Sequence, residues 1–69
     1  MSFPAPTAAA VRKAREQTNM SREEAARIIG LPRPRWSEYE SGTRPMRGTD
    51  WELFLLLTDQ HPGLLLVMR

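Results

Sequence analysis

The sequence predicts a small all-α protein, built as a bundle of four to five helices. Four segments with helical character each begin at a capping residue or a proline, and glycine, proline or asparagine separates each from the next. A chain of 69 residues is also short enough to form one domain around one small core. We therefore expect a single domain over residues 1–69.

The first helix is expected directly after residues 1–6, which contain two prolines and are predicted to form a flexible arm. Thr7 is a suitable N-cap for the segment AAAVRKAREQT, which is rich in good helix formers. Val11 and Ala14 share the face expected to be buried. Asn19 is the residue expected to take the left-handed conformation that commonly ends a helix.

The second helix has the clearest start signal in the chain. Ser21 is followed three residues later by Glu24, which is the spacing of a capping box. The predicted apolar face consists of Ala25, Ala26, Ile28 and Ile29. Gly30 comes next, at the position where glycine usually terminates a helix.

The third helix is predicted within residues 30–42, GLPRPRWSEYESG. The two prolines of this segment suggest a loop at first sight. Proline is tolerated in a first helical turn, whose N–H groups have no intrahelical partner. A helix that begins near Arg33 puts Pro32 at the cap and Pro34 in the first turn. Trp36 and Tyr39 then share one face, and we expect them in the core rather than as stacking platforms for bases.

The fourth helix is predicted over WELFLLLTDQ, with Thr49 or Asp50 as its cap. Its apolar residues cover more than one side, so we expect burial on more than one side. The sequence HPG ends it, and the tail over residues 64–69 is either a last helical turn or a strand, because its periodicity does not decide.

Composition excludes several classes of protein. The chain has no cysteine and one histidine, so disulfides are excluded and neither a zinc site nor any other metal or cofactor is expected. The runs LFLLL and LLLVM are too short to span a bilayer, and no secretory signal is visible, so we expect a cytoplasmic protein without a membrane partner.

Charge is distributed unevenly along the chain, although the formal net charge is only +2. Residues 1–47 carry +4 and residues 48–69 carry −2. A polyanionic partner for the first part and an ordinary solvated surface are both compatible with this distribution.

Residues 22–42 form a helix-turn-helix pattern: two short helices joined by a tight glycine turn, the first capped and the second bearing basic residues. The stretch MSREEAARIIGLPRPRWSEYESGTRP resembles the Cro/C1-type (XRE) family of phage and plasmid repressors, and the resemblance runs from about Val11 to Pro45. It implies a lambda repressor-like DNA-binding domain. It also implies a semi-buried ion pair between Arg15 and Glu40.

Four positions depart from the pattern of that family. Ala25 stands where leucine is more common, and Trp36 stands where a smaller aliphatic residue is usual, which indicates an exchange of volume between the two. Asn19 replaces a common glycine, and Pro32 replaces the usual cap residue of the recognition helix.

The resemblance assigns DNA contacts to two groups of residues. The helical face opposite Trp36 and Tyr39 is expected to read bases in the major groove, whereas the surrounding polar residues are expected to hold phosphates. The base-reading candidates are Arg33, Pro34, Ser37, Glu38 and Ser41, and the phosphate candidates are Arg22, Arg35, Thr43 and Arg44.

The function expected from the sequence is that of a regulator, most simply a repressor, which binds a palindromic operator in double-stranded DNA as a homodimer. Residues 50–69 are expected to form the dimer, through Phe54, Leu57, Leu64 and Leu66. The alternative is an interaction module, such as an antitoxin whose apolar C-terminal segment binds a different protein. Neither enzymatic activity nor a small-molecule ligand is expected, because no catalytic constellation is apparent.

Overall fold

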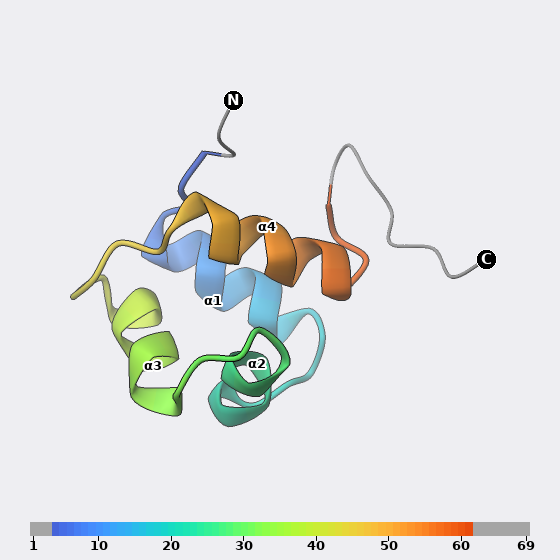
Figure 1. Cartoon of the computed structure of the whole chain (residues 1–69), viewed down its shortest axis with the longest axis horizontal. Helices are drawn as coiled ribbons and strands as arrows, with labels where there is room; N and C mark the ends of the chain where they lie inside the picture. The colour runs from blue at the N-terminus through green and yellow to red at the C-terminus, as the bar shows by residue number, and fades with distance from the viewer. Residues whose placement is uncertain (1–3, 62–69) are drawn as a thin grey trace.

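A computed structural model describes residues 4–61 of the chain, and this part is all-α (Figure 1). Its four helices are α1 (Ala8–Glu16), α2 (Arg22–Ile28), α3 (Arg33–Ser41) and α4 (Gly48–Leu57), and residues 4–61 contain no strand. The predicted fold class is therefore confirmed. The tail over residues 64–69, where a fifth helix or a strand was expected, lies outside the described residues.

The helix starts follow the predicted caps at α1, α2 and α3. The Thr7 side chain accepts a hydrogen bond from the Ala10 N–H at the start of α1. The Ser21 hydroxyl accepts from the Glu24 N–H while the Glu24 carboxylate accepts from the Ser21 N–H, so the capping box is complete. At α3, Pro32 occupies the N-cap position without a side-chain hydrogen bond, as its ring requires.

Left-handed residues end or follow the helices where the sequence predicts them. Asn19 has φ +60°, and Gly30 and Gly42 have φ +75° and +82°. Because Gly42 has no Cβ, it adopts this conformation without steric strain, and α3 ends there.

The bounds of α4 differ from the prediction at both ends. The helix begins at Gly48 and has Arg47 at its N-cap position, so neither Thr49 nor Asp50 is the cap. Asp50 lies in the first turn, where its charge suits the helix dipole. The helix ends at Leu57, because Thr58 is the C-cap and Asp59 is left-handed with φ +65°.

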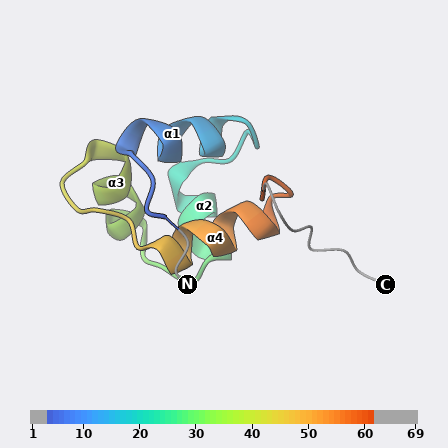
Figure 2. The ribbon, with the colours of Figure 1, turned by 90° about the horizontal axis from the view of Figure 1, so that it is seen from above.

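The four helices pack around one small core. The helix α2 packs against α3 and α4, and α1 packs against α3. Figure 1 shows α2 below α1 and α4, and Figure 2, seen from above, shows α3 at one end of the molecule. The buried apolar side chains are Val11, Ala14, Ala25, Ala26, Ile29, Trp36, Tyr39, Met46, Phe54 and Leu55.

Two expectations about apolar residues are wrong. Phe54 was assigned to a dimer interface, but it is fully buried within the chain, with its ring centroid 4.9 Å from that of Trp36. Ile28 was placed on the buried face of α2, but it is 37% exposed, because α2 ends there and only Ile29 turns into the core.

Candidate functional site

The turn between α2 and α3 fixes how the two helices meet. The Ala26 carbonyl accepts from the N–H groups of Ile29 and Leu31, at 3.2 and 2.9 Å, and Gly30 between them is left-handed. Ala25 of α2 and Trp36 of α3 are both fully buried members of the same core. The exchange of volume expected between these two residues stays a prediction.

The inner face of α3 belongs to the core. Trp36 and Tyr39 are 0% and 2% exposed, so the prediction that they are core residues is confirmed. The Tyr39 hydroxyl donates to the Asp50 carboxylate at 3.1 Å, which ties α3 to the first turn of α4. Burial raises the pKa of Tyr39, so the phenol stays protonated as a donor.

Glu40 is the centre of a buried polar network. It is 5% exposed, and Arg15 pairs with both of its carboxylate oxygens, at 2.5 Å from Nε and 3.2 Å from Nη2. The Trp36 indole N–H donates to the same carboxylate, and Arg15 also donates to the Met20 carbonyl at 2.9 Å. The structure therefore contains the ion pair that the resemblance implies, with an indole donor that the sequence did not predict.

The charge state of Glu40 follows from these contacts. Burial alone raises the pKa of its carboxyl, but hydrogen bonds from Arg15 and Trp36, together with the nearby charge of Arg22, hold the pKa below its ordinary value. Glu40 is thus ionised at neutral pH and locks α1 onto the end of α3.

The outer face of α3 is open to solvent. Arg33, Pro34 and Ser41 are exposed, while Ser37 and Glu38 are half-buried. These five base-reading candidates lie together on the side of the helix that is turned away from Trp36 and Tyr39. No other described helix lies beyond α3 at its end of the molecule, so this face is accessible (Figures 1 and 2).

A cluster of exposed charges surrounds Glu38. Its Oε1 accepts a hydrogen bond from Arg44 Nε at 2.7 Å and lies 3.7 Å from Arg35 Nε. The hydrogen bond to Glu38 raises the pKa of Arg44. Thr43 lies in the same loop, with its hydroxyl 2.8 Å from that of Ser41. Three of the phosphate candidates therefore lie near Glu38 and Ser41: Arg35 in the first turn of α3, and Thr43 and Arg44 in the loop after the helix.

The fourth phosphate candidate lies at the start of α2. Arg22 is about half exposed, and its Nε is 3.5 Å from the Glu40 carboxylate. A hollow between α1, α2 and α3 is lined by Arg12, Arg22, Ser37, Glu38, Glu40 and Ser41. Arg12 is exposed on α1 and was missed by sequence reasoning. Its only sequence signal was its position one turn before Arg15, on the helix that packs against α3.

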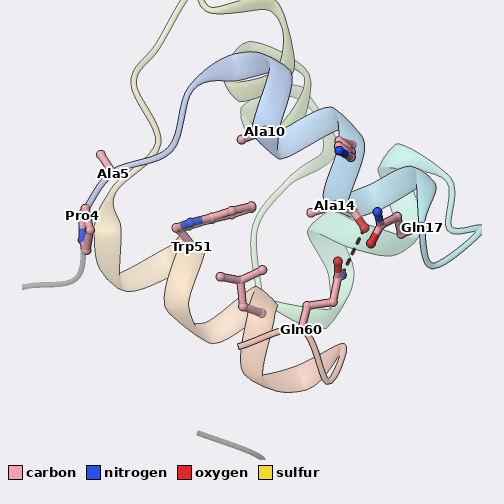
Figure 3. A pocket seen from close by; sticks show the side chains of 9 residues that line it. Pro4, Ala5, Ala10, Ala14, Gln17, Trp51 and Gln60 are labelled. Atoms are coloured by element: carbon pink, nitrogen blue, oxygen red, sulfur yellow. Dashed lines mark hydrogen bonds between the residues drawn. The ribbon is translucent and has the colours of Figure 1, made fainter. Parts of the chain in front are cut away.

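A second hollow, of about 500 Å³, lies between α1 and α4 on a different side of the molecule (Figure 3). The Trp51 ring extends from α4 toward α1, and Ala10 and Ala14 line the opposite wall. The Gln60 side chain donates to the Ala14 carbonyl at 3.1 Å across its end. The lining is mainly apolar, with Lys13 as its one charged residue, so this groove has little to offer a polyanion.

Of the four residues predicted to form the dimer interface, one is exposed, one is buried and two lie outside the described residues. Leu57 is 41% exposed on α4, whereas Phe54 is buried, and Leu64 and Leu66 lie outside the described residues. Leu53, one turn before Leu57, is 40% exposed and was not predicted. The two leucines therefore form a small apolar face on α4.

Residues 4–61 contain neither a helix suited to a membrane nor a cluster of metal-ligating side chains. None of the described helices has the length and apolar character to cross a bilayer. Nor does this part of the chain gather three side chains of the types that usually ligate metals.

The sequence was then compared with known proteins. The family model described as a helix-turn-helix domain matches residues 8–64, which is most of the chain. No curated protein and no solved structure matches the chain. The matched region contains α1 to α4 in full.

Proposed function

The chain belongs to the helix-turn-helix domain family, and from this premise we propose that it is a sequence-specific regulator that binds double-stranded DNA. The observation that carries the proposal is the solvent-facing outer side of α3, with Arg33 at its start and Arg44 in the loop after its end. In a helix-turn-helix protein the second helix of the motif enters the major groove. Here that helix is α3.

The proposed contacts fall into two classes. Arg33, at the start of α3, has a planar fork long enough to reach the O6 and N7 atoms of a guanine. The other base-reading candidates are Pro34, through apolar contact, and Ser37, Glu38 and Ser41. Arg12, Arg22, Arg35, Thr43 and Arg44 flank this face and are proposed to hold phosphates, which carry no sequence information.

A Cro/C1-type repressor that acts as a homodimer on a palindromic operator is the finer form of this proposal. The support is the resemblance over residues 11–45 and the exposed pair Leu53 and Leu57 on α4, which a second copy would cover. Dimers of such proteins read half-sites about one helical turn apart. Light scattering should then give twice the chain mass of 7.9 kDa, and Leu57→Glu should lower it toward the monomer.

The same apolar face also supports the alternative, an antitoxin-like module that binds a different protein. A chain that remains a monomer of 7.9 kDa and selects no DNA sequence would favour this alternative. An operator selected by a dimer would exclude it as the main function.

Selection of binding sites from random duplex DNA is the direct test. We expect an enriched site with two inverted halves. Arg33→Ala should then flatten the preference at one position of each half-site, at a cost of about 1–3 kcal/mol per contact. Arg44→Ala should keep the preference, weaken binding to all sequences alike and reduce the salt dependence by about one counterion per subunit.

The two variants serve as controls for each other, because each removes one arginine from the same surface. If Arg33→Ala leaves the ratio of affinities for selected and scrambled DNA unchanged, Arg33 is a phosphate contact and the assignment of base contacts is wrong.

A further inference from the structure

Glu38 is the one acid among the proposed base-reading residues, and its carboxylate has partners within the chain. Arg44 donates to it at 2.7 Å, and Arg35 lies 3.7 Å away. Both arginines are proposed phosphate contacts, so Glu38 and the DNA backbone compete for the same two cations. An acid beside phosphates also weakens binding to every sequence unless a donor on the duplex pairs with it.

The backbone holds Glu38 and Arg44 close together. The Arg44 N–H donates to the Glu38 carbonyl at 3.3 Å, and the Ser41 hydroxyl donates to the same carbonyl at 3.2 Å. The loop that carries Arg44 is therefore folded against the end of α3. The two side chains remain 50% and 39% exposed, so their ion pair is weak and can exchange partners.

We propose that Glu38 couples base recognition to phosphate binding. In the free protein it holds Arg44, and less closely Arg35. In the complex a cytosine N4 amino group in the major groove takes their place on the carboxylate, and both arginines turn to phosphates. This inference rests on the proposed function, because it requires α3 in the major groove.

The coupling acts mainly by lowering the affinity for non-cognate DNA, and less by raising the affinity for the cognate site. Where the facing base offers no donor, releasing Arg44 leaves the Glu38 carboxylate unpaired beside the DNA backbone. The chain then keeps either the ion pair or the phosphate contact, and loses affinity in both cases. Glu38 thus raises specificity by penalising non-cognate DNA, which is a repulsive element rather than an added attraction.

The test is a double-mutant cycle on DNA affinity, with Glu38→Gln, Arg44→Ala and the double variant. Fluorescence anisotropy would measure binding to the selected site and to a scrambled duplex of the same length at one salt concentration. On scrambled DNA, Glu38→Gln should tighten binding about two- to fivefold per subunit, as expected for release of an exposed ion pair. The tightening should be much smaller when Arg44 is already absent. At the position that Glu38 reads, Glu38→Gln should weaken the preference for cytosine, because a neutral amide oxygen is a poorer acceptor than a carboxylate.

Glu16→Gln is the matched control, because it removes an exposed acid from α1 outside this cluster. It should change affinity for scrambled DNA less than twofold. If Glu38→Gln tightens binding equally with and without Arg44, Glu38 is only a repulsive charge and the coupling is wrong. The coupling is also wrong if the substitution weakens binding to scrambled DNA.

Binding-site selection with the wild-type chain distinguishes failure of the proposed function from failure of the coupling through Glu38. A wild type that selects no site overturns the proposed function together with this inference. A wild type that selects a site, combined with a cycle that shows no coupling, overturns the inference alone. Since Glu38 is a surface residue, a thermal melt of each variant should show that the fold is retained.

Discussion

Glu38 and Glu40 stand two residues apart on α3, yet they lie on opposite faces of it. Two residues along a helix correspond to about 200° around its axis, so one carboxylate faces solvent when the other faces the core. The side chain of Glu38 is 39% exposed and that of Glu40 is 5% exposed. The helical period, and not the residue type, therefore separates the buried face of α3 from the face proposed to contact DNA.

The partners of the two glutamates follow from their surroundings. Buried Glu40 has Arg15 and the Trp36 indole as fixed donors, and its loss would leave both without their shared acceptor. Exposed Glu38 has Arg44 and Arg35, which water or DNA can replace. A buried pair is costly to break, whereas an exposed pair contributes little to stability. Substitutions on the inner face of α3 should therefore change the free energy of unfolding, and substitutions on the outer face should change DNA affinity.

The largest effect is expected for Glu40→Ala. Removal of the carboxylate leaves a mostly buried guanidinium on Arg15 with only the Met20 carbonyl, and it also deprives the indole of its acceptor. The free energy of unfolding should fall by about 3 kcal/mol, which is the lower end of the range for a broken buried pair. Chemical denaturation followed by circular dichroism would measure this change.

Glu16→Ala is the matched control for this substitution, because Glu16 is an exposed acid on α1 next to Arg15 in the sequence. It should change the free energy of unfolding by less than about 0.5 kcal/mol. Equal melting of Glu40→Ala and the parent chain would mean that the network around Glu40 is not formed in solution.

The second-largest effect is expected for Trp36→Phe. This substitution removes the indole N–H that Glu40 accepts and leaves a small cavity beside Phe54, whose ring centroid is 4.9 Å away. A loss of about 2 kcal/mol is expected from the lost charged hydrogen bond and the cavity together. Trp51→Phe, at a half-buried tryptophan in the α1–α4 groove, should cost clearly less in the same denaturation experiment.

Acid should destabilise the chain partly through Glu40. Its pKa in the folded state is lowered, so the unfolded state binds the proton more readily than the folded state. The stabilisation is complete above the unfolded pKa of about 4.3 and is lost as the pH falls through the folded pKa. Denaturation midpoints between about pH 6 and pH 3 should therefore fall more steeply for the wild type than for Glu40→Gln. Parallel profiles would mean that other acids dominate.

Most of the fold was accessible from the sequence because its signals are local. Caps at Thr7 and Ser21, and the glycines after α2 and α3, act within a few residues and need no tertiary information. The start of α4 was predicted too late because Asp50 is a good cap by propensity. In the structure its carboxylate instead accepts a hydrogen bond from Tyr39, a contact between two helices that local pattern does not reveal.

The site was less predictable wherever packing decides. Helical periodicity alone places the base-reading candidates on one face of α3, but the buried position of Phe54 depends on the Trp36 ring that packs on it. When a helix is apolar on several sides, its sequence does not indicate which side packs into the core of its own chain. Arg12 was missed for the same reason, because its place beside α3 is set by how α1 packs.

The smallest effect on stability is expected for Glu38→Gln. This substitution replaces a carboxylate by an amide, as Glu40→Gln does, but on the outer face of α3. The ion pair with Arg44 is exposed, and the amide that replaces the carboxylate still offers an oxygen to its guanidinium. The free energy of unfolding should change by less than about 0.5 kcal/mol, because exposed pairs of this kind rarely contribute more.

Glu40→Gln should lower the free energy of unfolding clearly more under the same conditions, since it leaves the mostly buried Arg15 without its counter-charge. Denaturation of both variants at neutral pH would give the two values side by side. Equal losses would show that the two faces of α3 do not differ in this way, and a larger loss for Glu38→Gln would mean that the loop carrying Arg44 is part of the stable core.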